Sequence, residues 1–119
     1  MPTIFVSLDS FAPGTEPTVT NSVTVNESGQ VTFNITWPSD QVNNGTCALQ
    51  FINGTQDPFN DQTNGVTSFN FSRANSNTPA IVNLNVESDA TIGTDTYCLT
   101  LTIDGQSFST DPMIVIKPT

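Results

Sequence analysis

The sequence contains no histidine, and its only basic residues are Arg73 and Lys117. Histidine is the commonest general base and the commonest transition-metal ligand, and without it no Ser-His or Cys-His nucleophile pair can form. Two cations cannot build a patch that follows a phosphate backbone. We therefore expect no enzymatic activity, no cofactor and no binding to nucleic acid.

Eleven acidic residues stand against these two cations, so the formal net charge is −9. Such a charge favours solubility, and it would also attract a basic partner surface. It disfavours anionic membranes, and no apolar run approaches the roughly 20 residues of a membrane-spanning helix. The start, "MPTIFVSLDSF", lacks the basic end and the small-residue cleavage site of a secretory signal. Either the protein is made and used without secretion, which Met1 favours, or a signal has been removed.

What the sequence does contain is a regular alternation of apolar and polar residues. Turn signals recur roughly every 8 to 12 residues, as in all-β domains. They include Asn-Gly pairs at 44–45, 53–54 and 64–65. No window keeps a 3.6-residue period, so we expect at most one helical turn, near 57–62. The expected strands cover residues 3–8, 19–26, 31–37, 46–52, 66–72, 80–87, 96–103 and 107–117.

These seven to eight strands predict an all-β fold, namely an immunoglobulin-like antiparallel β-sandwich, with a closed barrel as the alternative. Residues 19–119 would form the sandwich, and residues 1–18 an N-terminal arm or first strand with a Pro/Gly-rich connector. Every second residue of a strand faces the same side of its sheet, a rule that we call parity. It gives three sets of inward-facing side chains, which are Val31, Phe33, Ile35 and Trp37; Ala80, Val82, Leu84 and Val86; and Tyr97, Leu99, Leu101 and Ile103.

The two cysteines are expected to remain free thiols. Parity turns Cys47 inward with Leu49 and Phe51, whereas Cys98 points outward with its neighbouring threonines. Side chains on opposite faces of one sheet cannot reach disulfide geometry without a shift of register. Free thiols fit a reducing site of synthesis.

Two further patterns concern possible ligands. Asn-x-Ser/Thr triplets begin at Asn26, Asn34, Asn44, Asn53 and Asn70, but 13 Asn and 30 Ser or Thr in 119 residues produce about three such triplets by chance. For a hard cation such as Ca²⁺, the candidate loop acids are Asp57 with Asp61 and Asp89 with Asp95. Acids in loops are usually only solvated, so we expect no metal.

Both ends of the chain are apolar on both strand faces. "TIFVSL" and "MIVI" are either strands buried on both sides or surfaces that dock on a partner. The candidate docking residues are Ile4, Phe5, Val6, Phe11, Met113 and Val115. Phe59, in a polar loop, is a further candidate anchor.

Segments 22–36 and 86–105 resemble the Calx-β and immunoglobulin-like repeats of tailed-phage virion proteins. The matching residues are Glu27, Gly29, Val31, Thr32 and Phe33, then Asp89, Gly93, Asp95, Tyr97 and Leu99. The resemblance covers roughly residues 19–117 and implies that Tyr97 ties a loop back to its strand. Calcium-binding members tend to carry an acid where this chain has Ile92. Trp37 and Tyr97 are expected to be structural.

The resemblance implies a non-enzymatic virion protein, made in the host cytoplasm, that decorates or cements a phage capsid. Its partner would be a capsid or other virion protein. One alternative is a carbohydrate-binding or adhesive module of a fibre or cell-surface protein, which needs exposed aromatic rings. Another is a filament subunit that self-associates by strand exchange.

Overall fold

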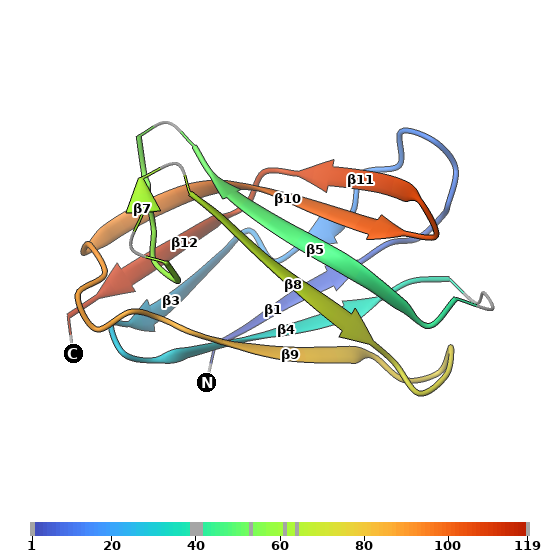
Figure 1. Cartoon of the computed structure of the whole chain (residues 1–119), viewed down its shortest axis with the longest axis horizontal. Coiled ribbons are helices and arrows are strands. Elements are labelled where there is room, and N and C mark those ends of the chain that lie inside the picture. Colours follow the sequence, from blue (N-terminus) through green and yellow to red (C-terminus); the bar gives the residue numbers. More distant parts are fainter. Residues whose placement is uncertain (1, 39–41, 53, 61, 64, 119) are drawn as a thin grey trace.

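A computed structural model describes the chain apart from residues 1, 39–41, 53, 61, 64 and 119 (Figure 1). The described residues form strands and no helix, so none of them belongs to a helix long and apolar enough to cross a membrane. The strands are β1 (Thr3–Ser7), β2 (Thr18–Val19), β3 (Ser22–Asn26), β4 (Gln30–Thr36), β5 (Asn44–Phe51), β6 (Gln56–Asp57), β7 (Gln62–Thr63), β8 (Val66–Ser72), β9 (Ala80–Asn85), β10 (Gly93–Ile103), β11 (Gln106–Thr110) and β12 (Met113–Lys117).

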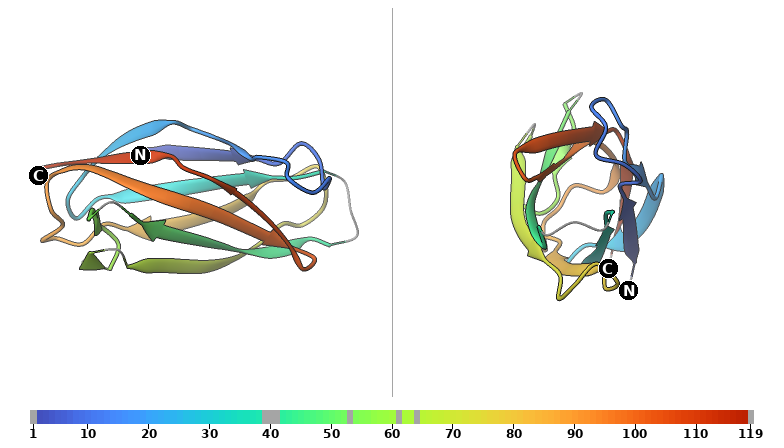
Figure 2. Two further views of the ribbon diagram at one scale, coloured as in Figure 1. Left: turned by 90° about the horizontal axis from the view of Figure 1, so that it is seen from above. Right: turned by 90° about the vertical axis from the view of Figure 1, so that its right-hand side faces the viewer.

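Two sheets face each other and form a β-sandwich that measures 41 × 26 × 19 Å (Figure 2). The first sheet has the order β2-β1-β4-β9. The second has the order β3-β12-β10-β5-β8, with β11 beside the second half of β10. A short β6–β7 hairpin stands apart from both. The prediction of an all-β sandwich is confirmed.

The core contains the side chains that parity turned inward. Val31, Phe33 and Ile35 are fully buried, and so are Leu99 and Leu101 on the facing sheet. On β9, which is an edge strand, Val82 and Leu84 are only half buried, because one side of that strand has no partner in its sheet. Alternation with polar residues therefore defines the two inner faces, as it does in sandwiches generally.

Two strand pairs are parallel, which the prediction of an antiparallel sandwich did not include. β1 pairs in parallel with β4, and β12 in parallel with β3. The cause lies in the connections: after β2 the chain passes to the second sheet to form β3 and then returns to the first sheet as β4. The successive strands β3 and β4 therefore do not pair as a hairpin, because they lie in different sheets.

Two local predictions also differ from the structure, namely the strand at 107–117 and the turn at Asn44–Gly45. The segment 107–117 is interrupted at Asp111–Pro112, although both halves pair with β10 in one register, with Thr110 opposite Leu99 and Met113 opposite Thr96. Proline has no N–H to donate to the ladder, so regular pairing stops there. Near 57–62 the described residues form a turn and parts of a hairpin and no helical turn, within the expected limit of at most one.

The Asn44–Gly45 pair lies in β5 rather than in a turn. A Cβ atom at Gly45 would come within 2.7 Å of both Phe71 Cζ and the Thr102 carbonyl oxygen. Glycine is needed here because two neighbouring strands approach closely, and not because of its turn propensity.

Candidate interaction surfaces

The predicted acidic pairs are not the pair that the structure brings together. Asp57 and Asp95 are both buried and interact electrostatically, whereas Asp89 is exposed on the surface. Asp61 lies outside the described residues. No group of three or more acidic or cysteine side chains gathers in the described part of the chain as a metal site would require.

Asp57 organises the loop that covers one end of the sandwich. Its Oδ1 accepts a hydrogen bond from the Phe59 amide at 2.9 Å. Its Oδ2 accepts one from the Thr67 hydroxyl at 2.6 Å and one from the Asn60 amide nitrogen at 3.2 Å. Both carboxylate oxygens are thus satisfied by the protein, so this acid has a structural role.

Asp95 is in a less favourable environment. Its Oδ2 is buried and finds no hydrogen-bond partner among the described residues. Burial, and secondarily the charge of Asp57, raises its pKa from 3.8 to about 6, while a hydrogen bond from the Gln56 backbone opposes the shift. A carboxyl group with these surroundings binds a proton more readily than an exposed one.

The predicted docking residues divide between the core and the surface. Ile4 and Val6 are each 1% exposed, because β1 lies between β2 and β4 with these side chains turned inward. They therefore belong to the core, and the prediction that they dock on a partner is wrong. Phe5, between them, points outward and is 58% exposed.

Of the remaining candidates, Met113 is the most exposed, at 42%, on the outer face of β12, whereas Val115 is half buried. Phe11 packs against Phe108, with ring centroids 6.4 Å apart, and is half buried. Phe59 is buried and packs against Phe51. Phe11 and Phe59 are therefore not the exposed aromatic platforms that a sugar-binding module would use.

Trp37 lies at the end of the sandwich opposite to the loop that contains Asp57. Its ring lies 5.2 Å from that of Phe71, and the guanidinium of Arg73 stands 3.8 Å from the Trp37 ring centroid. Arg73 also donates hydrogen bonds to the carbonyl oxygens of Trp37 and Pro38 and to the side chain of Asn43. Arg73 is thus engaged in the fold, which confines one of the two cations of the chain to a structural role.

Tyr97 is buried, but it does not form the predicted tie to a loop. Its hydroxyl has no hydrogen-bond partner among the described residues, and its ring packs 5.2 Å from Phe51. Burial and the neighbouring Cys47 raise its pKa. Tyr97 therefore contributes through packing rather than through its hydroxyl.

Both cysteines are free thiols, as expected, and the register of β5 and β10 puts Cys47 opposite Leu101 and Cys98 opposite Gln50. Burial raises the pKa of Cys47 to about 12. Cys98 is half buried on the outer face, where it contacts Thr100, Ser109 and Asp111, and burial raises its pKa as well. Neither thiol is activated for nucleophilic chemistry.

The outer face of the first sheet carries no charged side chain on its four strands. Phe5, Asn34 and Ile81 form one row across β1, β4 and β9. In the next rows the Thr32 hydroxyl donates to Asn83, and the Gln30 amide donates to Asn85. An exposed phenyl ring is thus surrounded by neutral amides and hydroxyls, which we call the Phe5 face.

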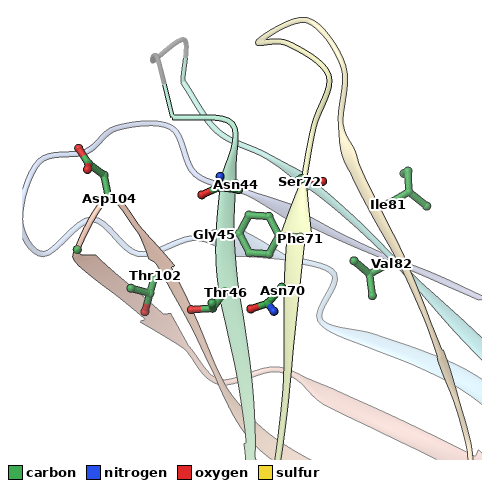
Figure 3. Close-up of a pocket in the computed structure, with 11 residues that line it drawn as sticks. Asn44, Gly45, Thr46, Asn70, Phe71, Ser72, Ile81, Val82, Thr102 and Asp104 are labelled. Atoms are coloured by element: carbon green, nitrogen blue, oxygen red, sulfur yellow. The ribbon is translucent and has the colours of Figure 1, made fainter.

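The second sheet carries a groove of about 520 Å³ near its Asp104–Gly105 hairpin (Figure 3). Thr102, Thr46 and Asn70 are register neighbours on β10, β5 and β8 and lie side by side (Figure 3). The polar lining consists of Asn44, Thr46, Asn70, Ser72, Thr102 and Asp104. Ile81 and Val82 supply apolar surface, and Phe71, a core residue, lies beside them.

Sequence reasoning found neither this groove nor the Asp57–Asp95 pair. The only signal for the groove was the pair of Asn-x-Ser/Thr triplets at Asn44 and Asn70. Their alternating positions place four polar side chains on one sheet face. No signal linked Asp57 to Asp95, because the link exists only through the packing of β6 against the start of β10.

Comparison with protein-family models and with curated protein sequences found no match. Among solved structures, auracyanin B is similar with a TM-score of 0.47 and 11% sequence identity, over 98% of this chain and 89% of that chain. The seventh ScaB type I cohesin from Pseudobacteroides cellulosolvens is similar with a TM-score of 0.36 and 19% identity, over 100% of this chain and 95% of that chain.

Proposed function

We propose that the chain is a non-enzymatic structural protein of a virion, namely a decoration protein that binds the capsid of a tailed phage through the Phe5 face. The assignment to a virion is suggested by the resemblance of segments 22–36 and 86–105 to repeats of tailed-phage virion proteins. The observation that carries the docking surface is the exposure of Phe5, at 58%, on an uncharged sheet face.

The Phe5 face has the composition of an interface centre. Such centres are depleted of charge and enriched in aromatic residues, and a few buried aromatic anchors supply most of the binding energy. Phe5 is held rigidly, since its backbone N–H donates to the Thr20 hydroxyl at 3.0 Å and its carbonyl accepts from the Thr20 amide. Because the backbone is already ordered, only the side-chain entropy of Phe5 is lost when a partner covers the ring.

Acidic residues lie beyond the ends of the strands that form this face. Asp9 follows β1, and Glu87 and Asp89 follow β9 at the other end of the sheet, and all three are exposed. A neutral centre between acidic ends is complementary to a capsid surface with a neutral patch between basic residues. Binding should then weaken as salt rises, because exposed charges are screened.

The structure offers the strand-exchange alternative no support. β1 is already paired with β2 and β4, and β12 with β10 and β3. Neither terminal strand presents an unsatisfied backbone edge along its whole length, and exchange would first have to break these ladders.

The test uses the intact chain and empty shells assembled from the major capsid protein encoded in the same genome. We expect saturable co-sedimentation that weakens when salt is raised. Phe5→Ser should reduce the affinity roughly tenfold or more, as expected for an interface anchor. Val66→Ser is the matched control, because Val66 is 51% exposed on the other sheet.

A genome without a capsid gene, or shells that do not retain the protein at low salt, would contradict the proposal. Equal loss of binding in Phe5→Ser and Val66→Ser would contradict the assigned face. Filaments formed by the protein alone would instead favour strand exchange.

A further inference from the structure

We infer that the groove on the second sheet is a binding site for a neutral saccharide chain. The inference does not rest on the proposed function, since the groove lies on the opposite layer of the sandwich from the Phe5 face. Ile81, on edge strand β9, borders both surfaces, but the polar residues of the groove belong only to β5, β8, β10 and the turn after β10.

The first argument is the number of free polar groups in one place. The side chains of Asn44, Thr46, Asn70 and Ser72 make no hydrogen bond within the part of the chain that the structure describes. Asn44 lies opposite Ser72 and Thr46 opposite Asn70, so the four form two adjacent cross-strand pairs. Together they offer amide donors, amide acceptors and hydroxyl groups on a rigid sheet.

Spacing favours a ligand that carries many hydroxyl groups. Side chains on neighbouring strands are about 4.8 Å apart, and those two residues apart on one strand about 6.7 Å. A ring with several hydroxyl groups can meet two or three of these positions at once. Thr102 extends the array. A hydrogen bond of 2.9 Å between the Thr102 and Ser107 hydroxyl groups fixes the orientation of its side chain.

The charge of the groove selects against anionic ligands. Among the residues that the structure describes, Asp104 is the one charged residue that lines the groove, and no basic side chain lines it. A carboxylate accepts hydrogen bonds from sugar hydroxyls but repels phosphates, sulfates and uronic acids. Nucleic acids and acidic polysaccharides are therefore poor ligands, whereas a neutral saccharide has no charge to oppose Asp104.

The backbone holds the groove in shape. Asp104 and Gly105 have φ angles of 53° and 76°, the left-handed conformations of a tight hairpin turn, which place the Asp104 side chain at the rim. The absence of a side chain at Gly45 lets the Phe71 ring and the Thr102 backbone come close at the floor. The apolar surface of exposed Ile81 and half-buried Val82 can contact the C–H face of a sugar ring, whereas Phe71 is 3% exposed and belongs to the core.

The experiment titrates the intact, isotope-labelled protein with neutral hexasaccharides of glucose (α- and β-linked), mannose and N-acetylglucosamine, and with oligogalacturonate as the acidic comparison. Binding is followed through backbone amide shifts up to about 10 mM saccharide. We expect at least one neutral oligosaccharide to shift the amides of residues 44–46, 70–72 and 102–105. Oligogalacturonate should bind roughly tenfold more weakly or not at all.

Two double variants separate the groove from the fold. Asn44→Ala/Asn70→Ala should lower the affinity roughly tenfold or more while the unfolding transition is retained. Asn83→Ala/Asn85→Ala, which removes the same two amides from the outer face of the first sheet, should leave the affinity unchanged.

No shift with any of the neutral saccharides would overturn the assignment. So would shifts confined to the Phe5 face, or tighter binding of oligogalacturonate. Shift mapping uses the unmodified protein, so it tests the inference even if a variant does not fold. Capsid co-sedimentation of Asn44→Ala/Asn70→Ala tests the proposed function separately. If this variant still binds shells, a failure of the saccharide inference leaves the proposed function untouched.

Discussion

Asp57 and Asp95 form a buried carboxylate pair where the loop containing β6 packs against the first residues of β10. Burial of Asp95, together with the charge of Asp57, raises the pKa of Asp95 from 3.8 to about 6. The folded protein therefore binds this proton more tightly than the unfolded chain does. By linkage, Asp95 favours folding most at low pH, and its contribution is lost as the pH rises through about 6.

The variant Asp95→Asn tests this relationship. At pH 7 it should be more stable than the wild type, by at most about 3 kcal/mol, because it removes a buried charge beside Asp57. Urea denaturation between pH 4 and pH 8 should show a stability decline in the wild type that Asp95→Asn reduces. Asp89→Asn, at an exposed acid, is the control. An unchanged pH profile in Asp95→Asn would show that the pair does not raise the pKa of Asp95.

Removal of residues 1–18 should prevent folding. This segment contributes Ile4, Val6 and Leu8, each no more than 2% exposed, and burial of one such side chain stabilises a protein by about 1.5–3 kcal/mol. The loss approaches the whole stability of an ordinary domain, about 5–15 kcal/mol. Amide chemical-shift dispersion measures the outcome, with Phe5→Ser as a folded control. A folded truncated protein would mean that β1 is a detachable arm.

Arg73→Ala should destabilise the protein by about 2–4 kcal/mol. It removes the stacking on Trp37 and leaves the carbonyl oxygens of Trp37 and Pro38 without their donor. Chemical denaturation measures the change, and the exposed Lys117→Ala serves as the comparison because it also removes one positive charge. An equally small change in the free energy of unfolding in both variants would mean that Arg73 does not stabilise the fold and contributes only to solubility.

Gly45→Ala should cost about 1–3 kcal/mol, because the added methyl group meets the Phe71 ring and the Thr102 carbonyl at 2.7 Å. Ser68→Ala, on the outer face of adjacent strand β8, should have an effect within about 0.5 kcal/mol. Thermal unfolding of both variants gives the comparison. Equal stability of Gly45→Ala and wild type would show that the sheet relaxes to accept a side chain there.

Thiol reactivity should differ between the two cysteines. Cys47 is fully buried with its pKa raised to about 12, so a thiol-specific reagent should label it only after unfolding. Cys98 is half buried on the outer face and should react slowly in the native protein. Mass spectrometry after labelling at neutral pH counts the modified thiols. An intramolecular disulfide in the oxidised native protein would mean that the register of β5 and β10 is wrong.

The alternation of side chains predicted most of this fold. Val31, Phe33 and Ile35 on one strand and Leu99 and Leu101 on another lie inward as parity requires, since a strand turns successive side chains to opposite faces. The same rule separated Cys47 from Cys98. These features depend only on neighbours along the chain, so they can be read without knowing which strands pair.

The order of the strands could not be predicted in this way. β1 and β12 pair in parallel with β4 and β3, because the chain alternates between the two sheets. The position of β1 within its sheet also makes core residues of Ile4 and Val6, leaving Phe5 as the exposed residue. Parity shows that successive side chains face opposite ways, but only the neighbouring layer decides which of them is covered.

The sequence by itself thus determined an acidic, strand-built protein without histidine, together with the alternation that fills its core. Only the tertiary structure decided that Asp57 meets Asp95, that Arg73 stacks on Trp37, and that Asn44 and Asn70 line one groove. The physical reason is that the pattern along a strand is local. Contacts between strands depend on sheet order and register, which the energy of the whole core selects.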